Sequence, residues 1–346
     1  MKVSVEQFFF EKKRLKKDES KEIFSILIYV GGDLLGDALL KVPFLRGLRQ
    51  CFPNAKITWL AGQTTTVFSD ILREMVRYEI DEVLNNAQIG VSIGEVLRSP
   101  LPGRHFDLII DTQKGFFTTL AVKRISHSVF ISPTMNFFFS AAKPKRPFPI
   151  NLQQQLFDLL ELVTGVAVEN SDIRLDVAKP LKEDAVKLLP DGPCYIGLAP
   201  GAGGRHKRWP LEHFVELARL LVLEGKVPVF FLGPGESDMC EVIQTLISEV
   251  LFPLQDDVIN HAFDPAFTLA LARRCQMNIT NDAGVGHICS LSGRPQLILF
   301  GPTSPAKFLP IVGDVHVLKA QDFGGRDMTL IPVKAVFKKM SDLSFG

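Results

Sequence analysis

The chain alternates between short apolar runs and longer segments in which apolar residues recur at helical spacing, beginning near residue 24. Phe24–Val30 is a continuous apolar run rich in β-formers, which is typical of a strand buried in a parallel sheet. Residues 36–51 follow with an apolar stripe that predicts a helix, and Pro43 is expected in its first turns, where proline is tolerated. The pattern therefore opens with a buried strand followed by an amphipathic helix.

The same alternation continues through the first half of the chain. Further strands are predicted at Ile57–Ala61, Glu79–Leu84, Phe106–Asp111 and Ser128–Ser132. Helices are predicted at Thr66–Met75 and at 151–164, the second ending at Gly165, and residues 135–149 are expected to form a loop.

The pattern restarts after a linker expected near residues 166–180. Strands are predicted at Cys194–Ala199, Val227–Leu232, Met277–Thr280 and Gln296–Phe300. Helices are predicted at Leu211–Glu224, Glu236–Val250, Thr268–Arg274, Gly284–Ser292 and Pro332–Met340.

Strands that alternate with helices form parallel sheets, so the sequence predicts an α/β protein with two Rossmann-like, doubly wound domains. We expect an N-terminal domain over residues 1–175 and a second over 176–330. A helix within 331–346 is expected to pack back on the N-terminal domain. Because such sheets bind ligands beyond the carboxyl ends of their strands, we expect the two domains to face a central cleft.

Composition narrows the class of protein. The 346 residues are 46% hydrophobic and carry a formal net charge of +1, which does not favour nucleic acid as the main partner. Five dispersed cysteines without CxxC spacing are typical of reduced thiols in a cytoplasmic protein. No run approaches the roughly 20 apolar residues that a transmembrane helix needs, and no secretory signal precedes the first strand.

Two basic clusters interrupt this neutral chain. One lies at Lys12–Lys17 and the other at Lys143, Lys145 and Arg146, among prolines. Both are compatible with solvated surface segments. They also leave open a peripheral contact with the anionic inner membrane, which a cytoplasmic enzyme can make through lysines and arginines.

Four loops follow predicted strands and carry candidate chemistry. In the first, Gly31–Asp37, the glycines allow a ligand to approach the backbone, whereas Asp33 or Asp37 could equally cap the following helix. The second, Pro200–Pro210, joins three glycines to three cations and a histidine, which suits a phosphate or pyrophosphate.

The third loop, Leu232–Glu236, ends in a carboxylate that could either favour the helix dipole or hydrogen-bond ribose hydroxyls. The fourth, Asn281–His287, places a histidine three residues after a glycine at a helix start, and Phe300–Thr303 adds a glycine and a hydroxyl at the next strand end. Three anion-friendly loops in one half predict a nucleotide diphosphate site in the C-terminal domain.

Taken together these motifs resemble glycosyltransferase family 9, the ADP-heptose:lipopolysaccharide heptosyltransferases, over about residues 24–340. The family's LGD loop with a following proline, its YDLVIDLQ-like strand, its PGA and KRWP loop, its D-[ST]-G-x-x-H loop and its LFGPT strand end all have counterparts in this chain. The matching residues are Leu35–Asp37 with Pro43, Phe106–Gln113, Pro200–Ala202 with Lys207–Pro210, Asp282–His287 and Leu299–Thr303.

The resemblance implies a GT-B fold and a metal-independent, inverting transfer of heptose, or a related sugar, from ADP-heptose to a lipopolysaccharide-core or other glycan acceptor. It implies that Asp37 is the general base, that Lys207 neutralises the donor pyrophosphate and that Glu236 contacts the ribose. No cofactor or metal is implied. The implied donor-binding residues are Gly36, Gly201, Lys207, Glu236, Asp282, Ala283, Gly284, His287 and Thr303.

Two positions differ from the family pattern. Residues 29–34 lack the arginine and serines that usually precede LGD, and Ala283 stands where the family has serine or threonine. Two alternatives therefore stay open beside a heptosyltransferase. One is another GT-B enzyme that uses a UDP- or GDP-sugar, and the other is a non-catalytic nucleotide-sugar-binding protein.

Overall fold

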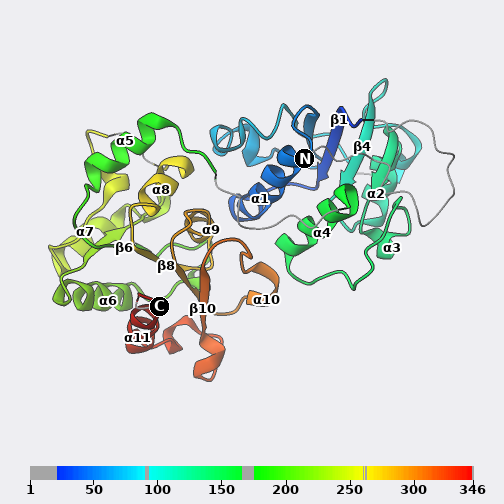
Figure 1. The fold of residues 1–346 in the computed structure, drawn as a ribbon. Helices are drawn as coiled ribbons and strands as arrows, with labels where there is room; N and C mark the ends of the chain where they lie inside the picture. The colour runs from blue at the N-terminus through cyan, green and yellow to red at the C-terminus, as the bar shows by residue number, and fades with distance from the viewer. Residues whose placement is uncertain (1–21, 90–92, 166–174, 260, 262, 345–346) are drawn as a thin grey trace. The chain divides into compact units, whose positions relative to one another are not determined.

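The computed structural model describes residues 22–89, 93–165, 175–259, 261 and 263–344. The chain divides near residue 170 into two compact units, Met1–Glu169 and Asn170–Gly346. Each unit contains a five-stranded parallel sheet with helices packed around it (Figure 1). The predicted α/β class with two Rossmann-like sheets is confirmed.

The first sheet has the strand order β3-β2-β1-β4-β5. Its strands are β1 (Ser25–Val30), β2 (Lys56–Ala61), β3 (Glu82–Leu84), β4 (His105–Asp111) and β5 (Ser126–Ile131). Its α-helices are α1 (Leu35–Cys51), α2 (Phe116–Lys123), α3 (Thr134–Phe137) and α4 (Leu152–Thr164). The central strand β1 is buried from Ile26 to Val30, as its continuous apolar sequence predicts.

Helix α1 keeps its apolar face on the sheet although Pro43 lies in its middle, not in its first turns as expected. Proline removes one backbone donor and loosens the helix around it. Gln153 on α4 donates from Nε2 to the backbone oxygen of Leu40 at 3.0 Å, beside the proline. The buried amide bond therefore joins α4 to the weakened part of α1, and the two helices pack together.

The helix predicted at Thr66–Met75 is wrong. The segment forms two 3₁₀ turns, η2 (Val67–Ser69) and η3 (Glu74–Val76), joined by hydrogen-bonded turns. At Asp70 the backbone leaves the helical region, with φ −135° and ψ −106°. Because a single residue outside the helical region stops propagation, the apolar spacing of this stretch yields separate turns.

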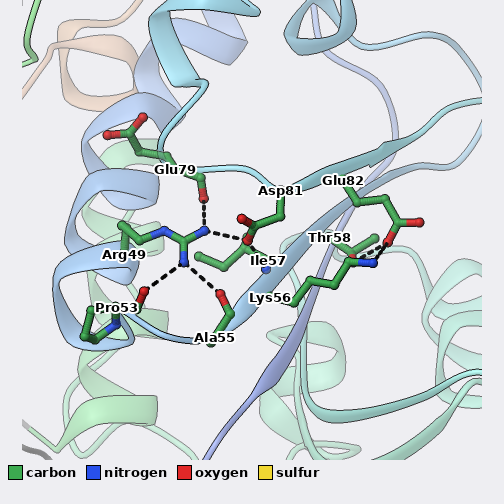
Figure 2. Close-up of polar contacts among 9 residues, drawn as sticks. All are labelled: Arg49, Pro53, Ala55, Lys56, Ile57, Thr58, Glu79, Asp81 and Glu82. Atoms are coloured by element: carbon green, nitrogen blue, oxygen red, sulfur yellow. Dashed lines mark hydrogen bonds and ion pairs between the residues drawn. The ribbon is translucent and has the colours of Figure 1, made fainter.

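Arg49 fastens the end of α1 to the edge of the sheet (Figure 2). Its guanidinium donates to the backbone oxygen of Ala55 at 2.7 Å, to that of Glu79 at 3.1 Å, and to Asp81 Oδ2 at 2.6 Å. The same carboxylate accepts the backbone N–H of Ile57 at 2.7 Å. One planar donor group thus fixes the α1–β2 connection and the start of β3 together.

The second sheet has the order β10-β9-β8-β6-β7. Its strands are β6 (Tyr195–Ala199), β7 (Val227–Phe230), β8 (Met277–Asn281), β9 (Gln296–Phe300) and β10 (Val315–Lys319). Its α-helices are α5 (Lys179–Leu188), α6 (Leu211–Leu223), α7 (Asp238–Leu246), α8 (Pro265–Ala272), α9 (Gly284–Ser290), α10 (Pro305–Phe308) and α11 (Val333–Ser344). Strands β6, β8 and β9 are buried along their whole length.

The last helix, α11, belongs to the core of this second unit. It packs against α6, and Val336 and Met340 are fully buried in the same apolar cluster as Trp209. Trp209 also donates from Nε1 to the backbone oxygen of Ile331 at 2.9 Å, just before the helix. The sequence led us to expect this segment on the N-terminal domain, but its apolar face is used within the C-terminal unit.

Asp111 ends β4 as a fully buried carboxylate. It accepts hydrogen bonds from Thr119 Oγ1 at 2.6 Å, Ser132 Oγ at 2.8 Å and the backbone N–H of Gln113 at 2.9 Å. Burial disfavours the charged form more than these bonds favour it, and it raises the pKa of Asp111 from 3.8 to about 6. The carboxylate thus joins the strand end to α2 and to the end of β5 while destabilising its own charge.

The raised pKa predicts a pH-dependent stability. Because the folded-state pKa of Asp111 exceeds the unfolded one, its contribution is fully present below about pH 4 and is lost as the pH rises through about 6. Asp111→Asn cannot ionise, so its unfolding free energy relative to wild type should improve by about 2 kcal/mol between pH 4 and pH 8.

Urea unfolding across this pH range measures the difference. A difference between Asp111→Asn and the wild type that stays constant with pH would contradict the assigned burial effect.

Candidate functional site

The order of the second sheet reverses between β6 and β8. The chain runs outward from β6 to β7 and then returns to the other side of β6 with β8, β9 and β10. Ligands of doubly wound sheets bind at such a reversal, beyond the carboxyl ends of the two strands. The loops that leave β6 and β8 there are 200–210 and 282–283, two of the loops singled out in the sequence.

Asp282, directly after β8, is the residue at which three of these loops meet. Its Oδ2 accepts a hydrogen bond from Thr303 Oγ1 at 2.7 Å, and Lys207 Nζ lies 3.8 Å from the same oxygen. The Asp282 side chain is 6% exposed, whereas that of Lys207 is 32% exposed. The buried carboxylate therefore holds an ammonium group that still faces solvent and can contact a second anion.

Asn281, the last residue of β8, joins the same loops from beneath and was given no role in the sequence analysis. Its Nδ2 donates to the backbone oxygen of Pro200 at 2.8 Å, and its Oδ1 accepts the backbone N–H of Trp209 at 3.1 Å. Both ends of the 200–210 loop are thereby tied to β8. The signal that the sequence offered for this role was an amide side chain at the end of a buried strand. Such an amide, which is fully buried here, needs hydrogen-bond partners from a neighbouring loop.

Glu236 lies in the short turn η7 (Pro234–Glu236) and faces the 200–210 loop. Its Oε2 accepts the backbone N–H of Gly233 at 2.8 Å, and its Oε1 is 3.9 Å from Arg208. A Cβ at Gly201 would collide with this carboxylate, so glycine there leaves room for the Glu236 side chain in this position. Structurally, Glu236 closes its own turn and lies against a loop cation.

Helix α9 begins at Gly284, and no side chain caps it because its N-cap residue is Ala283. Gly286 lets the helix pack closely on β8, since a Cβ there would lie 2.7 Å from the backbone oxygen of Asn281. His287 is 7% exposed on the following turn. The predicted residues of this loop therefore lie next to Asp282 along the chain, with His287 largely inside the protein.

A pocket of about 230 Å³ adjoins the 200–210 loop. Its walls combine apolar surface with two guanidinium groups, a mixture that suits an amphipathic ligand. The lining residues are Pro200, Arg205, Arg208, Trp209, Pro210, Leu211 and Met239.

In the N-terminal unit, Asp33 and Asp37 separate into two roles. Asp33 is buried, accepts hydrogen bonds from Trp59 Nε1 at 3.1 Å and Thr66 Oγ1 at 2.9 Å, and is ion-paired with Lys41. Asp37 is exposed in the first turn of α1 next to Gly36, and no hydrogen bond to its carboxylate is found within the described residues. Neither aspartate caps α1, whose N-cap is Leu34.

The remaining expectations concern metals and membranes. Among the residues that the structure describes, no group of three or more His, Cys, Asp or Glu side chains is placed to hold a metal ion. No helix in this part of the chain is long and apolar enough to cross a membrane. The cluster Lys12–Lys17 lies outside the described residues. Lys143 and Lys145 are exposed, whereas Arg146 pairs with Asp158 at 2.7 Å.

Comparison of the sequence with known proteins finds relatives among curated enzymes. Lipooligosaccharide heptosyltransferase 2 of Haemophilus influenzae is 30% identical over 178 residues, which cover 46% of this chain and 50% of that protein. Lipooligosaccharide heptosyltransferase 2 of Campylobacter jejuni is 25% identical over 273 residues, covering 78% and 79%. The chain thus spans half the length of the first relative and most of the second.

Solved structures share the fold. The crystal structure of the glycosyl transferase family 9 from Veillonella parvula has a TM-score of 0.71 at 22% identity, covering 93% of this chain and 97% of that one. The Escherichia coli ADP-heptose lps heptosyltransferase II has a TM-score of 0.63 at 21% identity, covering 93% and 99%.

A family-wide sequence comparison covers most of the chain, from β4 of the first unit to the end of the second sheet. The match is to glycosyltransferase family 9 (heptosyltransferase). It extends over residues 96–324 and includes the loops that meet at Asp282. The chain belongs to glycosyltransferase family 9, the heptosyltransferase family.

Proposed function

We propose that this protein transfers heptose from ADP-heptose to a glycolipid acceptor of the lipopolysaccharide-core type, with inversion at the anomeric carbon. Family membership and the names of the relatives support the sugar and the acceptor class. The single observation that carries the donor half is the cluster of Lys207, Thr303 and Asp282 at the reversal point of the C-terminal sheet.

The donor would bind with its diphosphate at Lys207, whose ammonium is anchored by Asp282 but exposed on one side. As the sugar is transferred, the bond between its anomeric carbon and the diphosphate oxygen breaks, and negative charge grows on the departing diphosphate. A fixed ammonium in a partly buried loop stabilises that charge more than water does, because its dipolar surroundings are already arranged. Thr303 fixes the orientation of Asp282 and so acts as a positioning residue.

Glu236 would accept hydrogen bonds from the ribose hydroxyls through Oε1, while Oε2 keeps its bond to the Gly233 N–H. Gly201 allows the carboxylate to lie this close to the 200–210 loop. Gly36, Ala283, Gly284 and His287 complete the proposed donor residues. At Ala283 only the backbone can contact the donor, because alanine has no side-chain hydroxyl.

Asp37 would act as the general base. Its carboxylate would take the proton from the acceptor hydroxyl while that oxygen bonds to the anomeric carbon on the face opposite the diphosphate. Exposure in the first turn of α1, without a hydrogen-bond partner among the described residues, leaves both oxygens of Asp37 available for this step. Asp33, four residues before Asp37 along the chain, is engaged by Trp59 and Thr66 and is unsuited to this step.

The base assignment predicts that Asp37→Asn lowers kcat by about 10²- to 10⁴-fold, the usual contribution of a general base. ADP release from ADP-heptose in the presence of a core glycolipid acceptor measures the rate. Folding should be unaffected, because the carboxylate is exposed.

Glu212→Gln is the matched control for this variant. Glu212 is likewise exposed in the first turn of a helix, α6, so it reproduces the change in helix-dipole interaction without touching the proposed site. The control should keep wild-type kcat. Full activity in Asp37→Asn, or no turnover by the wild type, would overturn the assignment.

The phosphate assignment predicts that Lys207→Met weakens ADP binding by about 10- to 100-fold, because one hydrogen bond to a charged group is lost. Isothermal titration at fixed salt measures the dissociation constant, and Lys207→Arg should recover part of the loss. Lys226→Met is the control, since Lys226 also pairs with a carboxylate, Glu224 at 2.6 Å, outside the site loops. Equal ADP affinity in Lys207→Met and Lys226→Met would contradict the assignment.

A further inference from the structure

Helices α2 and α3 of the N-terminal unit present apolar side chains to solvent. Three phenylalanines and one methionine are exposed here: Phe116 (42%), Phe117 (56%), Met135 (59%) and Phe138 (74%). We call these four residues, after the three rings, the aromatic patch. Helix α2 contacts α3, and Figure 1 shows the two helices on the same unit. A contiguous patch of exposed apolar side chains often marks an interaction surface, whereas single exposed apolar residues are normal on any protein.

Ring contacts make the patch continuous. The Phe116 ring lies 5.3 Å from that of Phe117 and 5.8 Å from that of Phe139, and Phe139 lies 5.1 Å from Phe138. Phe139 is only partly buried and connects α2 to the end of α3. One connected apolar surface therefore extends over both helices.

The backbone of α3, which carries Met135 and leads to Phe138, has an unusual conformation. Met135, Asn136 and Phe137 all have positive φ, at 49°, 53° and 65°. Residues other than glycine rarely adopt positive φ. Three such residues in succession therefore persist only where the surrounding structure enforces them. The turn buries Phe137 and leaves Met135 and Phe138 exposed.

The same stretch of sequence is strongly basic. Residues 112–157 contain six lysines and arginines and no aspartate or glutamate, in a chain whose net charge is +1. The ammonium of Lys123 donates to the backbone oxygen of Phe139 at 3.1 Å, and Lys143 and Lys145 are exposed. Arg146 is compensated by Asp158 and Glu161. The segment that carries the aromatic patch therefore has a net positive charge, which favours an anionic surface.

We propose that the aromatic patch docks on the surface of an anionic phospholipid bilayer, with its rings at the boundary of head groups and acyl chains and with the lysines at the phosphates. Aromatic rings and cations side by side are the combination that binds such an interface. The inference rests on the proposed function, because a glycolipid acceptor is anchored in a membrane.

The topology adds a reason for this position. Helix α2 follows the carboxyl end of β4, and α3 follows the carboxyl end of β5. The patch therefore lies on the side of the sheet formed by the carboxyl ends of its strands, from which the loop to Asp37 also leaves β1. A Cβ at Gly31, after β1, would lie 3.4 Å from Gln113 Oε1, which shows how near the β1 and β4 loops are. Docking would thus bring the edge that carries the proposed base to the membrane surface.

Co-sedimentation of the full chain with vesicles tests the proposal. The wild type should bind vesicles of phosphatidylcholine and phosphatidylglycerol, bind those of phosphatidylcholine alone much more weakly, and dissociate as salt is raised. Phe117→Ser/Phe138→Ser should lower the partition coefficient about tenfold or more, since two exposed rings no longer enter the interface. Lys143→Gln/Lys145→Gln should lower it by a similar factor and flatten the salt dependence.

Leu223→Ser/Val258→Ser is the matched control, because these side chains are 83% and 91% exposed in the other unit. It should bind vesicles like the wild type. Wild-type binding by Phe117→Ser/Phe138→Ser would overturn the proposal, and so would an absence of wild-type binding to anionic vesicles. Sedimentation without vesicles that disappears in this variant would identify the patch as a protein contact instead. Loss of binding only on deletion of residues 1–20 would assign the docking to the N-terminal basic cluster.

Turnover on a lipid-free core oligosaccharide separates this proposal from the proposed function. Both surface variants should keep wild-type ADP release on that soluble acceptor, because the patch is not part of the reacting groups. Vesicle binding without any turnover would refute the transferase assignment and leave the docking surface standing. Turnover on the soluble acceptor without vesicle binding would refute the docking surface and support the transferase assignment.

Discussion

Every strand in both sheets runs parallel to its neighbours, and this constraint places the chemistry of the protein. Parallel strands all leave the sheet at one edge, so the polar loops between strand and helix gather there while the strands remain apolar and buried. In the C-terminal unit Asn281 ties both ends of the 200–210 loop to β8 from a buried position, and Asp282 contacts Lys207 and Thr303 from the two neighbouring loops. The candidate site is therefore built on rigid strand ends, whereas its contacting groups lie on loops.

The carboxylates near these strand ends show how environment separates roles. Asp33 is buried with an ion pair and two hydrogen bonds, and Asp111 is buried with hydroxyl donors and a pKa raised to about 6. Both stabilise the loops that surround the first sheet. Asp37, by contrast, is exposed in the same region. A carboxylate that does no structural work among the described residues is free to serve a substrate, which supports Asp37 over its neighbour as the proposed base.

Much of the fold could be predicted because buried parallel strands have continuous apolar sequences and the long helices have apolar stripes. The elements that were missed lack those signals. Helix α2 is short and rich in β-branched residues, half of the residues of α5 are charged, and β10 is a half-exposed edge strand. The predicted helix at Thr66–Met75 failed because the backbone at Asp70 leaves the helical region, which apolar spacing does not encode.

The candidate site was predictable to the level of loops. Glycine-rich segments after strands indicated where Lys207, Glu236 and Asp282 would gather, since the strand order of a doubly wound sheet brings those loops to one edge. The partner of each residue was not predictable. That Thr303 bonds Asp282 and that Asn281 holds both ends of the 200–210 loop depend on tertiary distances between distant segments, and that Glu236 bonds the Gly233 N–H depends on the exact geometry of its turn.

A crystal structure of the protein with ADP-heptose tests the central claim most directly. We expect density for the diphosphate in hydrogen-bonding contact with Lys207 Nζ, beside Asp282 and Thr303, and for the ribose hydroxyls at Glu236. A donor bound away from the loops that follow β6, β7 and β8, with Lys207 still paired only to Asp282, would contradict it.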